Sequence, residues 1–249
     1  MATLTANEAT TDARQRPLLI ATAGTPCDPE RGLYFARKLA KEVRRLQPDR
    51  DVAAVTLADD DGFAAIAASM KEPIIFPHFV CDGTVVTSEL PRRLGQAGLK
   101  EWVTTVPFGL QRDLPHCAME RLRSAMRKHG LPTVETTLVL ALDTHACDAR
   151  GIAAAQAFAQ AIAPSRLFHE VRLCFLQGDS FMPGEGRELG QTLVVPFTTA
   201  KRADFEEEVM DKLSGLAAIG PILNPIGAWS FVPELVVEAV QKHAMNLVR

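Results

Sequence analysis

The sequence has 249 residues, 47% of them hydrophobic and 23% charged, so it can bury a substantial core and is not a disordered chain. A formal net charge of −3, with Lys and Arg scattered along the chain, argues against nucleic acid as a partner. Five cysteines without a CxxC pair indicate a reducing compartment, and we expect a cytoplasmic protein.

The first 16 residues are polar and are expected to form a disordered tail. They contain no apolar core typical of an export signal. No later stretch reaches the roughly 18 uninterrupted apolar residues that predict a membrane span. We therefore expect no association with a membrane.

From residue 17 onward, short apolar runs alternate with longer segments of helical periodicity, which is typical of parallel sheets covered by helices. The predicted strands are 17–22, 51–57, 73–79, 102–108, 136–142, 171–176, 192–197 and 221–226. The clearest predicted helices are 30–46, 115–128, 151–163, 204–216 and 232–247. Asp148 and Asp204 stand at expected N-cap positions of two of these helices.

The two sets of four strands match each other at an offset of about 120 residues. Pro107-Phe108-Gly109 corresponds to Pro225-Ile226-Gly227, and LLIATAG from residue 18 corresponds to LVLALDTHA from residue 138. We predict an α/β fold of two similar half-domains, 17–130 and 136–249, each a four-stranded parallel sheet flanked by helices. Gly130 and Pro132 suit the linker between them.

Common enzyme motifs are absent from the sequence. It contains no GxxxxGK[ST], no GxGxxG after the first strand, no GxSxG and no HExxH. We therefore expect no nucleotide cofactor, and neither serine-hydrolase nor zincin chemistry is indicated.

Three segments at predicted strand ends resemble the class II metal chelatases, which include ferrochelatases and sirohydrochlorin cobalt chelatases. They are ATAGTPCDP (21–29), DGTVVTSELP (82–91) and ALDTHACDARG (141–151). The resemblance implies a cleft between the halves, beyond the carboxyl ends of the strands, that binds a tetrapyrrole small molecule. It also implies that a divalent metal, Co²⁺ or Fe²⁺, is a substrate inserted into a sirohydrochlorin- or porphyrin-type ring. The chain is expected to be a monomer or a homodimer.

The residues of the family's metal site are only partly kept. In the first half, the strand-end histidine, the second-strand glutamate and the third-strand histidine correspond to Ala23, Ala58 and Val85. None of these side chains can hold a metal. In the second half the corresponding residues are taken as His145, Gln177 and Asp204. The resemblance therefore implies that the second half carries the chemistry.

His145 is the central candidate, because a neutral imidazole can bind a metal or accept a proton near neutral pH. Asp204 or the nearby Glu206 is the candidate acid that passes protons out. Cys147 and His78 are further candidate metal ligands. The simpler interpretations are that His145 caps the next helix, that Asp204 and Glu206 form a solvated first helical turn, and that Cys147 is an inert buried thiol.

Three further residues are candidates for binding the tetrapyrrole. Arg202 can pair with its peripheral carboxylates, Phe181 can cover its flat face, and Thr25 lies in the Gly-Thr-Pro turn after the first strand. Surface solvation is the simpler interpretation of Arg202. Because so many expected ligands are missing, a non-catalytic tetrapyrrole- or metal-binding protein of the same fold is the alternative.

Overall fold

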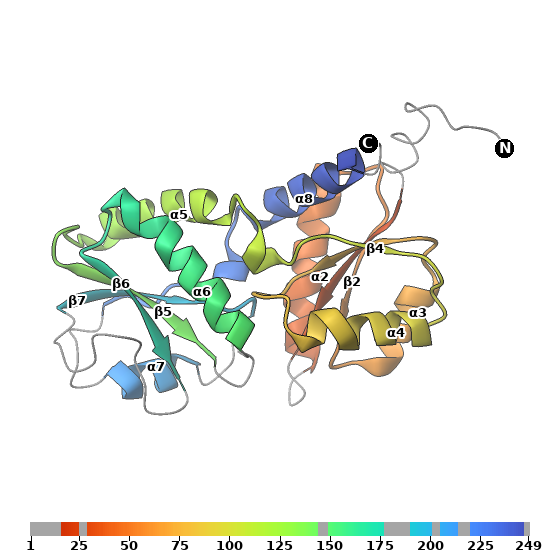
Figure 1. Cartoon of the computed structure of the whole chain (residues 1–249), viewed down its shortest axis with the longest axis horizontal. Helices are drawn as coiled ribbons and strands as arrows, with labels where there is room; N and C mark the ends of the chain where they lie inside the picture. The colour runs from red at the N-terminus through yellow and green to blue at the C-terminus, as the bar shows by residue number, and fades with distance from the viewer. Residues whose placement is uncertain are drawn as a thin grey trace. The chain divides into compact units, whose positions relative to one another are not determined.

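The computed structural model describes residues 16–24, 29–143, 149–176, 190–200, 205–213 and 220–246. The chain divides into two compact units. The first comprises Met1–Gln111 with Ser230–Arg249, and the second comprises Arg112–Trp229. Each unit contains one parallel sheet (Figure 1).

The sheet of the first unit has the strand order β2-β1-β3-β4. Its strands are β1 (Leu18–Thr22), β2 (Val52–Thr56), β3 (Ile74–Pro77) and β4 (Val103–Thr104). All neighbouring strands pair in parallel, so each connection crosses over through a helical segment. The central strand β1 is buried along its whole length, as its uninterrupted apolar sequence LLIAT predicts.

Helices cover both faces of this sheet. They are α2 (Pro29–Leu46), α3 (Asp60–Ala68), the π-helical turn η1 (Val85–Glu89), α4 (Leu90–Gln96) and the C-terminal α8 (Val232–Asn246). Helix α2 packs on β1 and β2, and α8 packs on α2 and β3. Helix α3 begins where the Asp59 carboxylate accepts a hydrogen bond from the Gly62 N–H at 3.0 Å.

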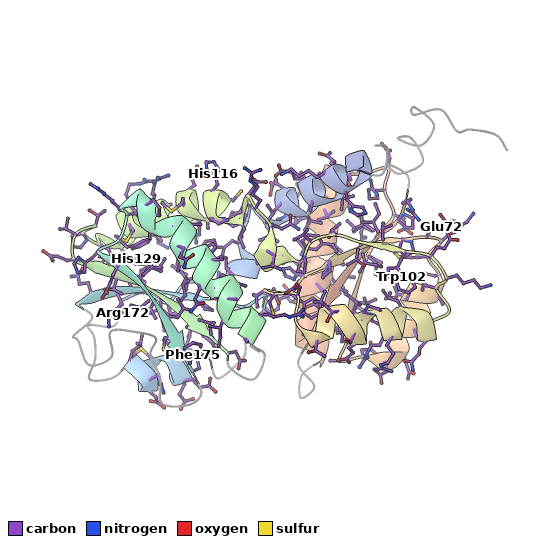
Figure 2. All side chains as sticks on the ribbon, in the orientation of Figure 1. Glu72, Trp102, His116, His129, Arg172 and Phe175 are labelled. Carbon is purple, nitrogen blue, oxygen red and sulfur yellow. The ribbon has the colours of Figure 1, made fainter. Side chains whose placement is uncertain are left out.

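The second unit is built on a sheet with the order β6-β5-β7. Its strands are β5 (Thr136–Leu142), β6 (Glu170–Phe175) and β7 (Gln191–Pro196), and all pair in parallel. The helices are α5 (Leu114–His129), α6 (Ala149–Ile162) and α7 (Phe205–Leu213). Arg172 and Phe175 extend from β6 (Figure 2), and the Arg172 Nε atom lies 2.9 Å from the Glu170 carboxylate.

The expected fold class is confirmed, with two corrections to the predicted strands. Residues 221–226 do not form a fourth strand of the second sheet; only Ile222 bridges to Val194. Pro221 and Pro225 flank this bridge, and a proline has no N–H to donate to a longer ladder. In the first unit the predicted strand 102–108 is likewise reduced to two residues, Val103–Thr104.

Two helices lie in the unit that does not contain their own half of the sequence. Helix α5, which precedes Gly130, belongs to the second unit, where it contacts α6. Helix α8, at the C-terminal end of the chain, belongs to the first unit. Gly130 ends α5 with a φ of +62°, a left-handed conformation that glycine adopts without a steric penalty.

One apolar cluster in each unit joins the sheet to the helices on one of its faces. In the first unit it contains Phe63 and Ala67 of α3, Leu90 and Leu94 of α4, and alternate residues of the strands, and the partly buried Trp102 packs against it (Figure 2). In the second unit α7 contributes Phe205, Val209 and Leu213. Residues between these strand positions, such as Leu18 and Leu138, are also fully buried, so both faces of each sheet are covered.

None of the helices within the described ranges has the length and apolar character that a membrane crossing requires.

His243 on α8 gives this packing a dependence on pH. Its Nε2 atom is buried without a hydrogen-bond partner among the described residues. Burial, helped by the positive charge of Arg16, lowers the pKa of His243 below its ordinary value. The unfolded chain therefore binds a proton more readily than the folded one, so stability is complete above the ordinary histidine pKa of about 6.5 and falls below it.

We expect the free energy of unfolding to decrease as the pH falls from 7.5 to 5.5, and His243→Gln to reduce that decrease. Urea unfolding of both proteins at each pH measures the difference. His129→Gln, the same change at an exposed histidine, serves as the control. An unchanged pH dependence in His243→Gln would show that protonation of this imidazole does not oppose folding.

Candidate functional site

The carboxyl ends of the strands are where a parallel sheet presents side chains and loops to a ligand. Most of the site residues predicted from sequence fall outside the described residues; these are Thr25, His145, Cys147, Phe181, Arg202 and Asp204. Gln177 and the expected N-cap Asp148 fall outside them too. The described part of the chain contains Glu206 and His78, together with the ends of all the strands.

Matching hydrogen bonds tie the strand ends together in the two units. In the first unit the His78 N–H donates to the Ala21 carbonyl at 2.8 Å, and the Leu57 N–H donates to the Thr22 carbonyl at 2.9 Å. In the second unit the Phe197 N–H donates to the Ala141 carbonyl at 2.8 Å, and the Leu176 N–H donates to the Leu142 carbonyl at 3.0 Å. Thr22 and Leu142 therefore occupy equivalent positions, as the last residues of the two central strands.

This equivalence places Asp143, the residue after Leu142, at the position that Ala23 has in the first unit. The expected alignment of Ala23 with His145 is thus two residues out of register. Asp143 is only 8% exposed and directly follows the central strand β5. A buried carboxylate at the carboxyl end of the central strand is the residue that sequence reasoning passed over, although the offset of about 120 residues already aligned Asp143 with Ala23.

The two apolar clusters show the same correspondence between the units, and they extend it to the third strand and the helix that follows it. All eight residues of the second cluster have a counterpart in the first at an offset of about 120 positions. The pairs are Leu19 and Val139, Ala21 and Ala141, Val55 and Cys174, Leu57 and Leu176, Ile75 and Val194, Val86 and Phe205, Leu90 and Val209, and Leu94 and Leu213. The residue before Phe205 therefore corresponds to Val85, as expected for Asp204.

Glu206 lies in the first turn of α7, next to Glu207 and Glu208. Its side chain is exposed. Three carboxylates near a helix N-terminus are favoured by the partial positive charge of the free N–H groups there. This explains the acidic run structurally, and it leaves the Glu206 side chain in contact with solvent at the carboxyl edge of the sheet.

The same edge of the first unit offers no metal ligand at the three family positions. Ala23 and Val85 are exposed and Ala58 is half-buried, so all three side chains lie at the surface of the carboxyl edge. Alanine and valine have no lone pair to donate. The two units thus share their packing but differ in the polarity of this edge.

His78 ends β3 and is 3% exposed. Its ring lies 5.3 Å from the ring of Phe108 and 6.5 Å from that of Phe76, measured between centroids. Aromatic neighbours of this kind bury the imidazole within the first unit. They favour a role for His78 in packing, and its assignment as a metal ligand stays a prediction.

Cys174 is also unsuited to metal binding or redox chemistry. It lies on β6 in the apolar cluster, and burial raises the pKa of its thiol to about 11, against a smaller opposing effect of Lys212. A thiol with this pKa carries almost no thiolate near neutral pH. Within the described ranges, no three His, Cys, Asp or Glu side chains are grouped so that they could hold a metal ion.

Neither a protein-family model nor a curated protein matches the chain. Solved structures do. CbiX, described as the terminal enzyme for biosynthesis of siroheme in denitrifying bacteria, aligns with a TM-score of 0.75 and 26% identity. The alignment covers 91% of this chain and 99% of CbiX. SirB from Bacillus subtilis, in a structure with Fe³⁺, aligns at a TM-score of 0.66 over 94% of this chain and 97% of its own; at 14% identity it supports the fold alone.

Gly24 permits the close approach of the chain after β1 to the end of β2. Its φ is +69°, and a Cβ atom there would lie 1.9 Å from the Thr56 Oγ1 atom and 2.8 Å from the Ala58 Cβ atom. We expect Gly24→Ala to destabilise the protein by about 1–3 kcal/mol, through backbone strain and displacement of Thr56. Thermal unfolding measures this loss.

Gly98→Ala is the matched control. Gly98 also has a positive φ, +87°, but nothing lies within 4 Å of its hypothetical Cβ atom. An equal loss of stability in the two variants would show that the cost of Gly24→Ala comes from backbone strain alone, and not from the contact with Thr56.

Proposed function

Because the chain belongs to the class II tetrapyrrole metal chelatase superfamily, we propose that it inserts a divalent metal ion into a sirohydrochlorin- or porphyrin-type ring. The observation that carries the proposal is the alignment with CbiX, which extends over 99% of that enzyme at a TM-score of 0.75.

The reaction exchanges one metal ion for two protons. M²⁺ enters the ring and bonds to its four nitrogen atoms, while the two N–H bonds break and both protons leave. The protein must therefore provide groups that accept protons and a carboxylate or imidazole that binds the metal weakly and releases it. We expect these groups at the carboxyl edge of the second sheet, where the described acidic residues include Asp143 and Glu206.

We assign His145 as the group that handles the metal or the first proton, two residues after the buried Asp143. Asp143, close to it in the sequence, is proposed to act as a carboxylate that offsets the incoming positive charge. Glu206 in the first turn of α7 and Asp204, which precedes this helix in the sequence, are proposed to pass protons to solvent. Arg202, Thr25 and Phe181 are proposed to bind the tetrapyrrole.

Co²⁺ and Fe²⁺ are both suitable substrates, since imidazole and carboxylate ligands accept either ion. The structure of SirB with Fe³⁺ shows that one protein of this fold binds iron. We propose that the reaction takes place in the cytoplasm, where thiols such as Cys174 stay reduced.

The alternative is a protein of this fold that binds a tetrapyrrole or a metal without catalysing insertion. It is favoured by one specific observation. The first unit has only Ala23, Ala58 and Val85 at the positions of the family's metal-binding side chains.

The test follows the absorbance of sirohydrochlorin mixed with Co²⁺ or Fe²⁺, with and without the protein. We expect insertion to be faster with the protein, and His145→Ala to lower the rate by about 100-fold, a typical loss for a proton-transfer group. Asp143→Asn removes the carboxylate that offsets the charge of the metal and is also expected to lower the rate. Glu207→Gln removes an exposed carboxylate from the same turn as Glu206 and is expected to leave the rate unchanged. Unfolding curves confirm that each variant is folded.

The outcomes separate the hypotheses. A rate no faster than without protein, together with a spectral shift of the bound tetrapyrrole, would favour the non-catalytic alternative. Absence of both acceleration and binding would contradict both functions. Full activity of a folded Asp143→Asn variant would remove Asp143 from the mechanism and leave the proposed reaction intact.

A further inference from the structure

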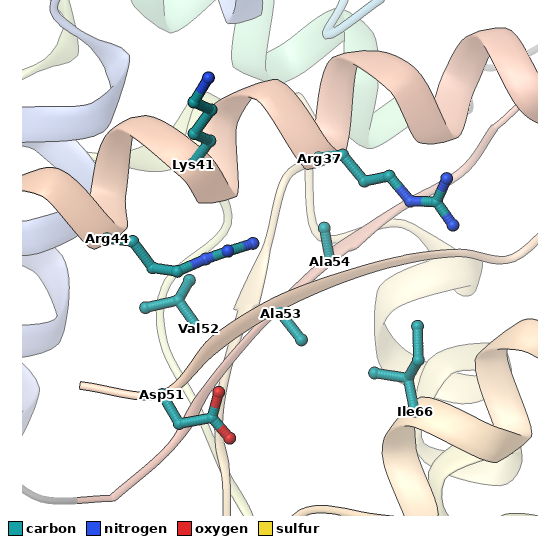
Figure 3. A pocket seen from close by; sticks show the side chains of 8 residues that line it. All are labelled: Arg37, Lys41, Arg44, Asp51, Val52, Ala53, Ala54 and Ile66. Carbon is teal, nitrogen blue, oxygen red and sulfur yellow. The ribbon is translucent and has the colours of Figure 1, made fainter. Parts of the chain in front are cut away.

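A groove with a volume of about 510 Å³ lies along the open side of the first sheet, between helix α2, strand β2 and helix α3. We call it the β2-edge groove. It is lined by Arg37, Lys41, Arg44, Asp51, Val52, Ala53, Ala54 and Ile66. Figure 3 shows Arg37 and Arg44 extending from α2 alongside the strand, Lys41 directed away from the strand, and Ile66 on the opposite side.

The basic residues of the groove have no ion-pair partner among the described residues. Arg37, Lys41 and Arg44 are exposed and follow one another at helical spacing, so they share one face of α2. Elsewhere in this unit the basic residues Arg16, Arg45 and Arg93 each pair with a carboxylate. With one acidic residue, Asp51, against three basic ones, the groove has an excess of two positive charges.

The floor of the groove is the edge of a sheet. In the described part of the first unit, β2 is the outermost strand, bonded on one side only to β1. The Asp51 carbonyl and the Leu57 N–H bond to β1, so the backbone groups of Val52 and Ala54, two alternate residues in between, point to the open side. At the end of the strand the Thr56 carbonyl already accepts a hydrogen bond from the Asp59 N–H at 3.3 Å. Unpaired backbone groups at an edge are a template for a further strand.

The dimensions of the groove fit an extended peptide. Arg37 and Arg44 are seven residues apart, which is about 10 Å along a helix axis. Three residues of an extended strand span the same distance, at about 3.3 Å per residue. A strand added to β2 would alternate its side chains between the cationic face of α2 and the apolar face that carries Ala53 and Ile66.

We propose that the β2-edge groove binds an acidic, extended segment of a partner protein, which adds to β2 as a further strand. Acidic side chains at alternate positions lie on the side of Arg37 and Arg44, and the residues between them face Ala53 and Ile66. A second copy of this chain does not fit, because edge-to-edge pairing would bring two sets of these cations together. The proposal does not depend on the metal-insertion activity.

The probe is a fluorescein-labelled nine-residue peptide in which Glu alternates with Thr or Ile, and its binding to the full-length protein is followed by fluorescence anisotropy. We expect saturable binding that weakens as salt is raised, since exposed charges are screened. The same peptide with Lys in place of Glu is not expected to bind. Equal binding of the two peptides, or of neither, would overturn the proposal.

Charge reversal tests the site. The double variant Arg37→Glu/Arg44→Glu is expected to weaken binding by about tenfold or more. The double variant Lys38→Glu/Lys100→Glu makes the same charge change at two exposed lysines of this unit outside the groove, and it should change binding much less. An equal loss of affinity in the two variants would show that binding depends only on the net charge of the protein, and would overturn the assignment of the groove as the binding site.

Strand addition is tested on the peptide, so the fold of the protein is untouched. N-methylation of the backbone at every second residue removes the N–H groups on one side of the extended peptide. We expect methylation of one alternate set to abolish binding and methylation of the other set to preserve it. Equal effects of the two sets, or competition by citrate as strong as by the unlabelled peptide, would show that the groove binds anions without pairing to β2.

Discussion

The architecture depends on the complete burial of the two central strands, β1 and β5. Each has a neighbouring strand on both sides and helices on both faces, and the strand residues are wholly apolar or, like Thr136 and Thr137, have their backbone groups in the ladder. Burial of this kind leaves polar chemistry only where the strands end. The carboxyl ends of β1 and β5 are therefore the places where a change of one residue alters function without disturbing the core.

The two units illustrate this separation of packing from chemistry. Eight pairs of cluster residues and two pairs of backbone hydrogen bonds correspond between them, yet the residues that follow the central strands are Ala23 in one and Asp143 in the other. Alanine makes the carboxyl edge apolar at this position, whereas aspartate places a carboxyl group there. A fold of this type tolerates the difference because neither residue lies within a ladder, so the chemistry can be concentrated in one unit.

A parallel sheet also has a second kind of exposed boundary, its lateral edge. At β2 this edge is flanked by cations of α2 that have no ion-pair partner among the described residues, and these cations disfavour edge-to-edge pairing of two copies and favour acidic segments. The carboxyl edge and the lateral edge of the first unit thus have different properties. The carboxyl edge is apolar at Ala23, Ala58 and Val85, and the lateral edge is basic. Binding of a partner at β2 would leave the carboxyl ends of the strands accessible.

The sequence by itself determined the α/β class, the parallel strands and the long helices, because a buried strand such as 136–142 and an amphipathic helix such as α2 are local patterns. Only the tertiary structure decided that 221–226 contributes a single bridge and that α5 and α8 pack on the unit formed by the other half of the sequence. These facts depend on pairing and packing between residues far apart in the chain, which no local pattern contains. The cations of the β2-edge groove, likewise, look like any other surface charges until the strand beside them is seen to be an edge.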